Sequence, residues 1–238
     1  MRTFTSYSNH DPVARQLVEE LHTIQNNPLK YRDQMRQIGK HLGAGVAPQL
    51  DKGLENDICV VCTVEDADFL GRGLIEELEQ RGFGSRLHLI CLWNDKISKN
   101  GVSLSPITRQ YKEDFDPKHS TFVVVKAIIS GACVVKTNLT RAISFADPSE
   151  IFVASPVMLV GAEDRLAQEF PDAISSKFKF VHFVTDSEKA ADGESVLPGI
   201  GGSLYELLGL GNRTEKNRYV PDIVKERRKK FFPAATTA

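Results

Sequence analysis

The sequence lacks any long apolar run. No window of its 238 residues approaches 18 consecutive apolar side chains, and the start "MRTFTSYSNHDPVARQ" has no hydrophobic stretch typical of a signal peptide. The chain also lacks a charge excess, since 30 basic side chains stand against 31 acidic ones. No overall field therefore draws it onto nucleic acid or an anionic membrane. These absences predict a cytoplasmic protein with no membrane partner.

Cysteine is scarce as well. The four cysteines stand at positions 59, 62, 91 and 133, and three lie in apolar, strand-like runs, which is typical of reduced buried thiols. Cys59 and Cys62 form a C-x-x-C, but residues three apart on a strand point to opposite faces of the sheet. We therefore expect neither a redox pair nor a metal site.

Short apolar runs alternate with helical windows from residue 57 onward. The runs read "DICVVCTV", "RLHLICLW", "TFVVVKAII", "EIFVASPVML" and "FKFVHFVT". Their Val and Ile content, without polar alternation, is typical of strands buried on both faces. The pattern predicts an α/β fold, with a mostly parallel sheet and helices on both faces.

Two amphipathic helices are predicted ahead of this sheet. The first has Asp11 as its N-cap and Pro12 in its first turn. Its apolar positions are Val13, Leu17, Leu21 and Ile24. Those of the second are Tyr31, Met35, Ile38 and Leu42, and we expect that helix to end at Gly43. Both are interpreted as packing elements.

Two segments depart from the alternation. Residues 94–119 contain an Asn-Gly turn between "KISK" and "VSLS", which predicts a projecting hairpin or mobile flap. Residues 212–238 are more polar than the rest, so we divide the chain into a domain of residues 1–211 and a basic C-terminal arm. Its "VKERRKK" run is interpreted as a solvated helix or a subunit-wrapping tail, with RNA binding as the alternative.

Three loops are candidates for ligand binding, because ligands of open parallel sheets bind where strands end and helices begin. They read "TVEDAD" at 63–68, "ISGAC" at 129–133 and "LPGIGGSLYELLGLG" at 197–211. In this order, with two leading helices and a flap, they resemble the uracil phosphoribosyltransferases, a branch of the type I phosphoribosyltransferase family. The resemblance covers about residues 10–211.

The flap carries part of this resemblance. "HLICLWNDK" is similar to the family's strand ending in Tyr-Arg-Asp-Glu, and "SPITRQYK" to its Pro-Val-x-Tyr-Tyr-x-Lys. Asp95 and Lys112 are thereby in step with flap residues of the family. The resemblance implies transfer of a ribose 5-phosphate group from phosphoribosyl pyrophosphate to uracil with Mg²⁺, in a homodimer.

The first loop departs from the family. Glu65 stands where the family has the arginine of its pyrophosphate loop, and Ala67 where it has a glycine. Glu65 and Asp66 would each repel pyrophosphate by about 1 kcal/mol at contact distance in water. A magnesium ion would reverse that sign, since carboxylates are its natural ligands. The alternative is a solvated acidic loop or a helix N-terminus stabilised by acids.

The second loop departs as well. Lys126 aligns with the family's ribose-binding acid, Gly131 with its threonine, and Ala132 and Cys133 with its two glycines. A shift of one residue would instead place Ser130 and Gly131 on the Thr-Gly pair. The Ser130 hydroxyl, the amides of residues 131–133 and the following helix still suffice for an anion, which Lys126 would strengthen. A plain strand-to-helix turn is the alternative.

The third loop keeps its glycines and loses its charges. By resemblance, the base would be read by Leu197, Gly199, Ile200, Gly201 and Gly202. The family's two aspartates and its arginine are replaced by Gly202, Tyr205 and Glu206. The backbone of such a loop can still hold a flat ring, but specificity for uracil does not follow.

The reversed charges in two loops predict that phosphoribosyl transfer has been lost, because loss of several catalytic contacts leaves little rate. We then expect a protein that binds phosphate or a nucleotide, or an assembly or regulatory partner, and assign no catalytic residue and no certain cofactor. The alternatives are a repurposed enzyme in the same cleft, an active uracil phosphoribosyltransferase with Mg²⁺, and an RNA-binding regulator.

Overall fold

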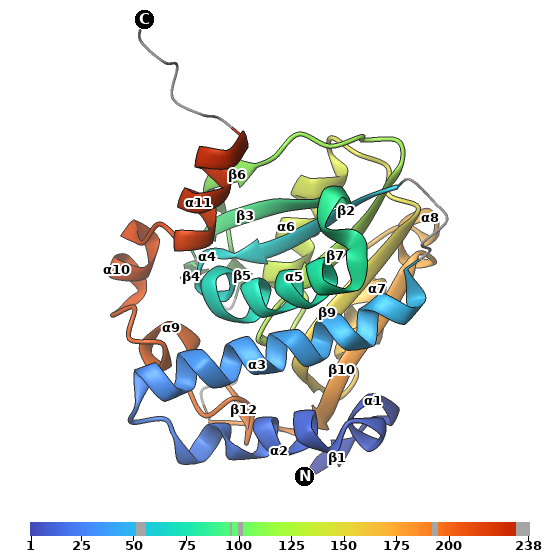
Figure 1. The fold of residues 1–238 in the computed structure, drawn as a ribbon. Coiled ribbons are helices and arrows are strands. Elements are labelled where there is room, and N and C mark those ends of the chain that lie inside the picture. The colour runs from blue at the N-terminus through green and yellow to red at the C-terminus, as the bar shows by residue number, and fades with distance from the viewer. Residues whose placement is uncertain (51–55, 96, 100–101, 192–194, 232–238) are drawn as a thin grey trace, which may run out of the picture.

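One twisted sheet with helices on both faces organises the chain (Figure 1). The computed structural model describes residues 1–50, 56–95, 97–99, 102–191 and 195–231. The strand order is β1-β10-β9-β7-β2-β3-β6, with β8 paired to β9. Strands β10, β9, β7, β2 and β3 run parallel, whereas β1 and β6 join the two edges antiparallel. The predicted α/β class with a mostly parallel sheet is confirmed.

The strands of this sheet are β1 (Arg2–Phe4), β2 (Asp57–Thr63), β3 (Leu87–Asn94), β6 (Ile107–Lys112), β7 (Ser120–Val125), β8 (Ile128–Ile129), β9 (Glu150–Leu159) and β10 (Phe178–Asp186). Two small antiparallel ribbons are formed by β4 (Ile97–Lys99) with β5 (Val102–Leu104) and by β11 (Glu188–Lys189) with β12 (Val196–Leu197).

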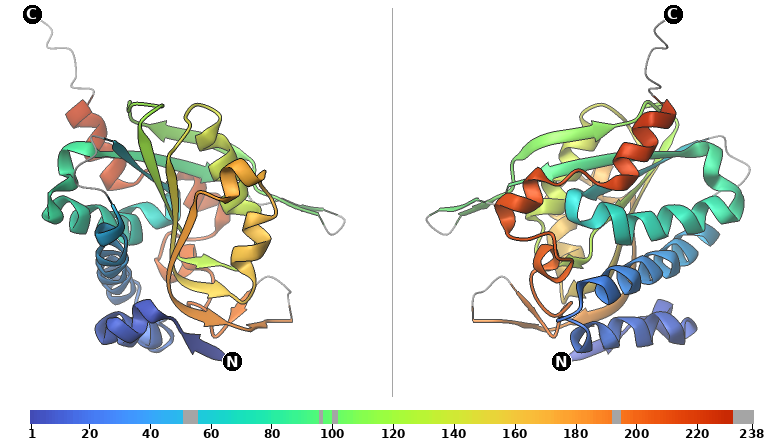
Figure 2. Two further views of the ribbon diagram at one scale, coloured as in Figure 1. Left: turned by 90° about the vertical axis from the view of Figure 1, so that its right-hand side faces the viewer. Right: turned by 60° about the vertical axis from the view of Figure 1, so that its left-hand side comes forward.

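The helices form two layers that enclose the sheet (Figure 2). One layer and its approach contain α1 (Ser6–His10), α2 (Pro12–Glu20), α3 (Pro28–Val46), α4 (Val64–Asp66) and α5 (Arg72–Leu78). The other contains α6 (Cys133–Ile143), α7 (Ala162–Ala167) and α8 (Asp172–Ser175). The chain ends with α9 (Leu204–Leu207), α10 (Arg213–Arg218) and α11 (Asp222–Phe231). No helix within the described ranges is long and apolar enough to cross a bilayer.

Each buried strand supplies side chains to two hydrophobic cores, one on each side of the sheet. Cys62 belongs to the core shared with α3 and α5, whereas Cys59 belongs to the core shared with α6 and α7. The two thiols of the C-x-x-C therefore lie on opposite faces, as the strand period requires.

Helix α2 begins as predicted but presents a different face. The Asp11 side chain accepts a hydrogen bond from the Ala14 amide at 3.0 Å. Leu21 is buried as predicted, but Val13, expected in the core, is 55% exposed, and Ala14 and Val18 are buried in its place. The prediction for Val13 was wrong because two neighbouring faces of this helix are apolar, and only packing against α3 and β10 selects between them.

Helix α3 buries all four predicted apolar side chains but continues past Gly43 to Val46. The expected end at Gly43 was wrong because this glycine lies inside α3, at the point where α3 crosses α5. A Cβ atom on Gly43 would lie 2.9 Å from the Leu74 carbonyl oxygen, and one on Gly39 only 2.2 Å from that of Leu70. The backbones of α3 and the α5 region thus touch directly, which only glycine allows.

The predicted hairpin is present and projects from the body of the molecule (Figure 2). Its Asn-Gly turn at 100–101 lies outside the described residues. The chain then returns to the sheet as β6, where Arg109 pairs in register with Trp93 and Ile107 with Asn94. The two ends of the flap are therefore held together by the pairing of β3 with β6.

The C-terminal segment is docked over its described part, residues 212–231. Ile223 and Val224 join the hydrophobic core of the α3 and α5 side. Lys216 is only 5% exposed and Arg227 only 8%. The interpretation of this segment as a polar arm did not anticipate that two of its cations are buried.

Candidate functional site

The sheet has a topological switch point between β2 and β7. From β2 the chain proceeds through α5 to β3 on one side, and from β7 it proceeds through α6 to β9 on the other. Helices α5 and α6 cover opposite faces, so the two loops diverge as they leave the carboxyl ends of these strands. Ligands of open α/β sheets bind at this kind of crevice.

Two of the predicted loops meet at this crevice. The Ala127 amide donates to Asp66 Oδ1 at 3.0 Å, which joins the loop after β7 to the loop after β2. Lys126 Nζ lies 2.9 Å from Asp66 Oδ2 and 3.4 Å from Glu65 Oε1. The reversed charges of the two loops therefore pair with each other. Ala67 is buried behind them in the following helical turn, Ala67–Gly71.

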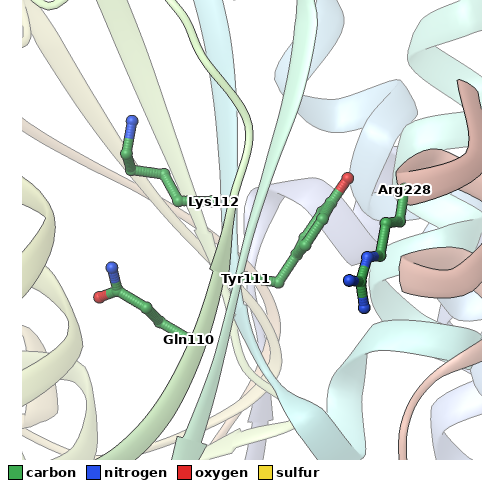
Figure 3. A pocket seen from close by; sticks show the side chains of 4 residues that line it. All are labelled: Gln110, Tyr111, Lys112 and Arg228. Atoms are coloured by element: carbon green, nitrogen blue, oxygen red, sulfur yellow. The ribbon is translucent and has the colours of Figure 1, made fainter. Parts of the chain in front are cut away.

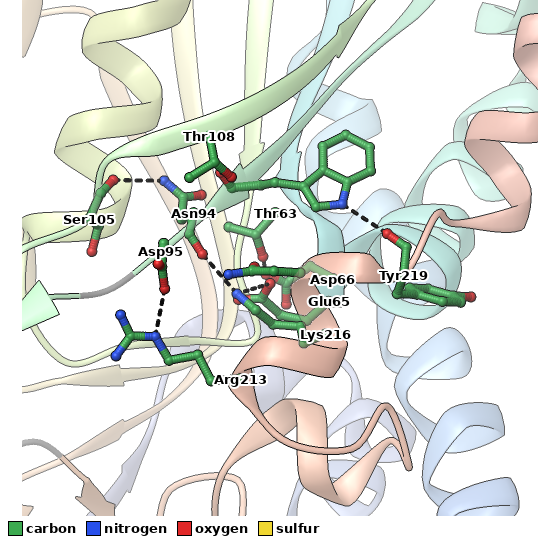
Figure 4. Close-up of polar contacts among 12 residues, drawn as sticks. Thr63, Glu65, Asp66, Asn94, Asp95, Ser105, Thr108, Arg213, Lys216 and Tyr219 are labelled. Atoms are coloured by element: carbon green, nitrogen blue, oxygen red, sulfur yellow. Dashed lines mark hydrogen bonds and ion pairs between the residues drawn. The ribbon is translucent and has the colours of Figure 1, made fainter.

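A second lysine enters the crevice from α10 (Figure 4). Lys216 Nζ lies 3.5 Å from Glu65 Oε2 and donates to the Asn94 carbonyl oxygen at 3.0 Å. Glu65, Asp66, Lys126 and Lys216 form what we call the crevice cluster. Its two carboxylates and two ammonium groups are formally neutral together. Sequence analysis missed Lys216 because about 150 residues separate it from Glu65.

Polar side chains around the crevice cluster are only partly satisfied. Thr63 Oγ1 donates to Asp66 Oδ2 at 2.5 Å, and Asn94 Nδ2 donates to Asn138 Oδ1 at 2.8 Å. Glu65 Oε2 and Asn94 Oδ1 are buried and accept no hydrogen bond from the residues that the structure describes. Buried acceptors without donors are uncommon in folded proteins, so these two atoms mark the crevice as unusual.

The cluster shifts the pKa values of its members in different directions. Burial raises the pKa of Glu65, but Lys126 and Lys216 outweigh it and lower that pKa overall. For Asp66, burial together with the Glu65 charge raises the pKa despite Lys126. Burial lowers the pKa of Lys126, yet Asp66 and Glu65 raise it by more. Lys126 is therefore charged at neutral pH and held by its carboxylates.

The loop predicted to bind phosphate leads into α6. Ser130, Gly131 and Ala132 precede the helix, which begins at Cys133. Space is open beside Gly131, since a Cβ atom there would meet nothing within 4 Å. Cys133 Sγ lies 3.5 Å from Ser105 Oγ at the flap base. Lys126 does not add a free positive charge to this loop, because its ammonium group contacts Glu65 and Asp66.

The glycine-rich loop at 197–202 uses its backbone internally. The Gly199 amide donates to Asp186 Oδ2 at 2.9 Å, and Arg2 donates to the Gly199 carbonyl oxygen at 2.7 Å. Tyr31 donates to the Ile200 carbonyl oxygen at 2.8 Å. Positive φ values of 58°, 94° and 149° at residues 199, 201 and 202 account for the glycines. Leu197 and Gly202 are exposed. The buried Arg2–Asp186 pair was not predicted.

The structure separates the two predicted flap residues. Asp95 lies at the rim of the crevice, where its Oδ1 is 2.7 Å from Arg213 Nε. Lys112 pairs in register with Ile90, four residues before Asn94, and so lies away from the crevice. It lines a surface pocket of about 500 Å³ together with Gln110, Tyr111 and Arg228 (Figure 3).

A further cavity of about 180 Å³ lies where β9 and β10 end. It is lined by Met158, Leu159, Gly161, Glu163, Asp164, His182 and Thr185. Burial lowers the pKa of His182 from 6.5 to about 4, and its Nε2 lies 2.9 Å from Thr185 Oγ1. Sequence analysis gave no signal for this cavity. Within the described ranges, no group of three or more His, Cys, Asp or Glu side chains is arranged to hold a metal ion.

No protein-family model and no curated protein matches this sequence. Among solved structures, the fold resembles hypoxanthine-guanine phosphoribosyl transferase from L. donovani, at 8% identity and a TM-score of 0.42 over 62% of this chain and 75% of that one. Hypoxanthine phosphoribosyltransferase from Staphylococcus aureus is similar at 12% identity and a TM-score of 0.41, over 65% and 74% of the two chains.

Adenine phosphoribosyltransferase from Thermoanaerobacter pseudethanolicus is similar at 8% identity and a TM-score of 0.38, over 63% of this chain and 83% of that one. At these values the likeness concerns the fold alone. No residue's role is carried over from these enzymes.

Proposed function

We propose that this chain is a phosphoribosyltransferase-like protein, of the uracil-specific branch, that has lost phosphoribosyl transfer and works as a binding or assembly protein. One observation carries the proposal: the crevice where the transferred group would lie is filled by the crevice cluster. Glu65 and Asp66 are 9% and 1% exposed, and the two lysines that neutralise them come from this same chain.

Electrostatics decide against a pyrophosphate ligand in this crevice. Such a ligand needs donors and positive charge, but Glu65 and Asp66 occupy its place by resemblance, and Lys126 is already paired. Removing one partner from a buried ion pair costs several kcal/mol, because the other charge is left uncompensated. Each lost catalytic contact also costs roughly 10²–10³ in rate. Turnover at the family's level is therefore not expected.

Magnesium does not fit the same carboxylates. A divalent cation on Glu65 and Asp66 would face the Lys126 ammonium group, which is 2.9 Å from Asp66 Oδ2. Repulsion between these cations opposes what the carboxylates would otherwise favour. No step of the proposed function uses a metal.

Phosphate or nucleotide binding is proposed at residues 130–133, in front of α6. The Ser130 hydroxyl and the amides of residues 131–133 are the donors, and open space beside Gly131 admits a phosphoryl group. A thermal-shift series with inorganic phosphate, pyrophosphate and uridine monophosphate tests this, since a ligand that binds only the native state raises its Tm. Ser130→Ala should reduce the shift, and Ser176→Ala, on a remote exposed turn, should not.

The transfer reaction is tested directly. We expect no release of pyrophosphate above background from phosphoribosyl pyrophosphate and Mg²⁺ with uracil, hypoxanthine or adenine. The same measurement on Lys216→Ala separates a lost reaction from one that α10 merely blocks. Turnover by the wild-type protein within about tenfold of the usual 1–10³ s⁻¹ would contradict the proposal.

A repurposed enzyme in the same crevice is the second candidate. It is favoured by the two buried acceptors without hydrogen-bond donors, Glu65 Oε2 and Asn94 Oδ1, because unsatisfied polar atoms cluster at functional sites. Substrate-dependent product formation that disappears in Glu65→Gln would support this candidate. We further propose a cytoplasmic homodimer, which light scattering after size-exclusion chromatography tests.

A further inference from the structure

Helix α10 is held over the crevice by cations on one of its faces. Arg213 and Lys216 are three residues apart, which places them on the same side of a helix. Arg213 contacts Asp95 at 2.7 Å, while Lys216 contacts Glu65 and the Asn94 carbonyl oxygen. Figure 4 shows both side chains directed from α10 toward the crevice and the flap base.

Helix α10 itself places no apolar side chain on the core, which the chain contacts only before it, at Leu210, and after it, at Tyr219 and Val220. Its sequence, "RTEKNR", contains no apolar residue, and Lys216 is its one buried side chain. Segments that bury little apolar surface open at free energies well below that of global unfolding. Opening of α10 therefore uncovers the crevice without unfolding the sheet.

The uncovered crevice favours a cation. Without α10, the carboxylates of Glu65, Asp66 and Asp95 face a single ammonium group, that of Lys126, which is a formal excess of two negative charges. Glu65 Oε2 and Asn94 Oδ1 are acceptors without donors among the described residues. An ammonium group supplies three donors and no acceptor, whereas a phosphate would bring further acceptors and negative charge.

The surroundings of Lys216 Nζ have the chemistry of an ammonium site. A carboxylate oxygen lies 3.5 Å away, a carbonyl oxygen accepts at 3.0 Å, and the ring of Tyr205 lies 5.9 Å away under the charge. A carboxylate, a carbonyl and an aromatic face together are suited to bind an alkylammonium ion. We infer that the crevice is a binding site for a small alkylammonium ligand, with Lys216 as its resident occupant and α10 as a displaceable cover.

Chemical rescue tests this inference. Lys216→Ala should lower the Tm by several degrees, and n-propylammonium, which has the three carbons and the ammonium group that the substitution removes, should restore at least half of the loss. Lys225→Ala is the matched control, because Lys225 is an exposed lysine on α11 that pairs only with Asp222 in the described structure. It should show neither the loss nor the rescue. Adding Glu65→Gln to Lys216→Ala should abolish the rescue.

Two further probes decide between charge and volume. n-Propanol fills the same space without charge, so rescue by propanol equal to that by propylammonium would overturn the inference. Stabilisation of Lys216→Ala by inorganic phosphate in place of propylammonium would overturn it too and support an anion site. Neither result would restore phosphoribosyl transfer, so failure here leaves the proposed function standing.

Wild-type protein offers an independent measurement if Lys216→Ala does not fold. Trp93 is the single tryptophan, and its indole N–H donates to the Tyr219 carbonyl oxygen at 2.8 Å, directly after α10. Displacement of α10 by spermidine should therefore shift the fluorescence of Trp93 in a saturable way. An unchanged emission spectrum across a spermidine titration, with NaCl at matched ionic strength as the control, would count against the inference.

Discussion

Helices α10 and α11 follow one another at the end of the chain, are both basic, and are attached to the sheet in opposite ways. Arg227 of α11 contacts Glu113 through two hydrogen bonds, of 2.7 and 2.8 Å. Tyr111 and the Leu89 amide donate to the same carboxylate, at 2.8 and 2.9 Å. Lys216 of α10 instead lies 3.5 Å from a carboxylate oxygen that accepts no hydrogen bond among the described residues.

Apolar packing separates the two helices further. α11 places Ile223 and Val224 in the core, and Asp68 caps its start by accepting from the amides of Asp222 and Ile223 at 2.7 Å. α10 places no apolar side chain in the core, although Asn212 caps its start by accepting from the amides of Thr214 and Glu215 at 2.9 and 3.1 Å. Two segments of similar composition can therefore differ in strength of attachment, because apolar burial and the complete hydrogen bonding of buried charges both contribute.

The largest effect is expected at α11. Arg227→Ala leaves the buried Glu113 carboxylate without its cation, which should lower the free energy of unfolding by about 3–5 kcal/mol. Urea denaturation measures this. Arg228→Ala, an exposed neighbour on the same helix, should stay within about 0.5 kcal/mol of wild type. Equal costs for the two variants would show that α11 is no better attached than a solvated helix.

The pH dependence of the free energy of unfolding adds a reference point outside both helices, because it depends on the burial of His182. Its pKa falls from 6.5 in the unfolded chain to about 4 on burial, so the unfolded state binds more protons between these values. The stability from its burial is complete above pH 6.5 and is lost as pH falls toward 4, by roughly 3 kcal/mol.

His182→Gln should flatten that part of the stability profile in urea titrations between pH 4 and 7. His22→Gln, at an exposed histidine, should leave the slope unchanged. A wild-type slope in His182→Gln would assign the acid sensitivity to other groups, such as the crevice cluster.

A smaller cost is expected at α10. Lys216→Ala should lower the free energy of unfolding by about 1–2 kcal/mol, because the hydrogen bonds and charge contacts that it removes are incomplete. Hydrogen exchange followed by mass spectrometry should show faster exchange in α10 than in α11 of the wild-type protein. Equal protection of the two helices would contradict the view of α10 as a displaceable cover.

The smallest effect is expected at the exposed contact of α10. Arg213 and Asp95 are 45% and 39% exposed, so Arg213→Ala should change the free energy of unfolding by less than about 0.5 kcal/mol. Raising the salt concentration should reduce even this difference. A cost equal to that of Lys216→Ala would mean that the rim, rather than the crevice, holds α10.

Periodicity was sufficient to predict the sheet. The runs assigned to β2, β3, β9 and β10 agree with the observed strands to within a residue or two, because strands buried on both faces are continuously apolar. The end of α3 could not be predicted, since Gly43 inside a helix crossing and Gly43 after a helix look identical in the sequence. The residues around Gly43 do not reveal that another helix packs against it.

The site was predicted only as far as strand order could bring it together. Glu65, Asp66 and Lys126 follow neighbouring strands, so their loops had to meet at one edge of the sheet. Lys216 and Asn94 were missed, because their contact depends on how a polar helix folds back across many residues. The charge of a loop can be deduced from the sequence, but the group that neutralises it cannot.

The base of the flap mechanically links the hairpin to the C-terminal segment. Asn94 ends β3 in register with Ile107, and the same residue offers its carbonyl oxygen to Lys216. The carbonyl oxygen that anchors Lys216 therefore belongs to the residue from which the flap departs. A ligand or subunit that displaced the base of the flap would act directly on this hydrogen bond, so contacts made by the hairpin and the cover of the crevice are coupled through one residue.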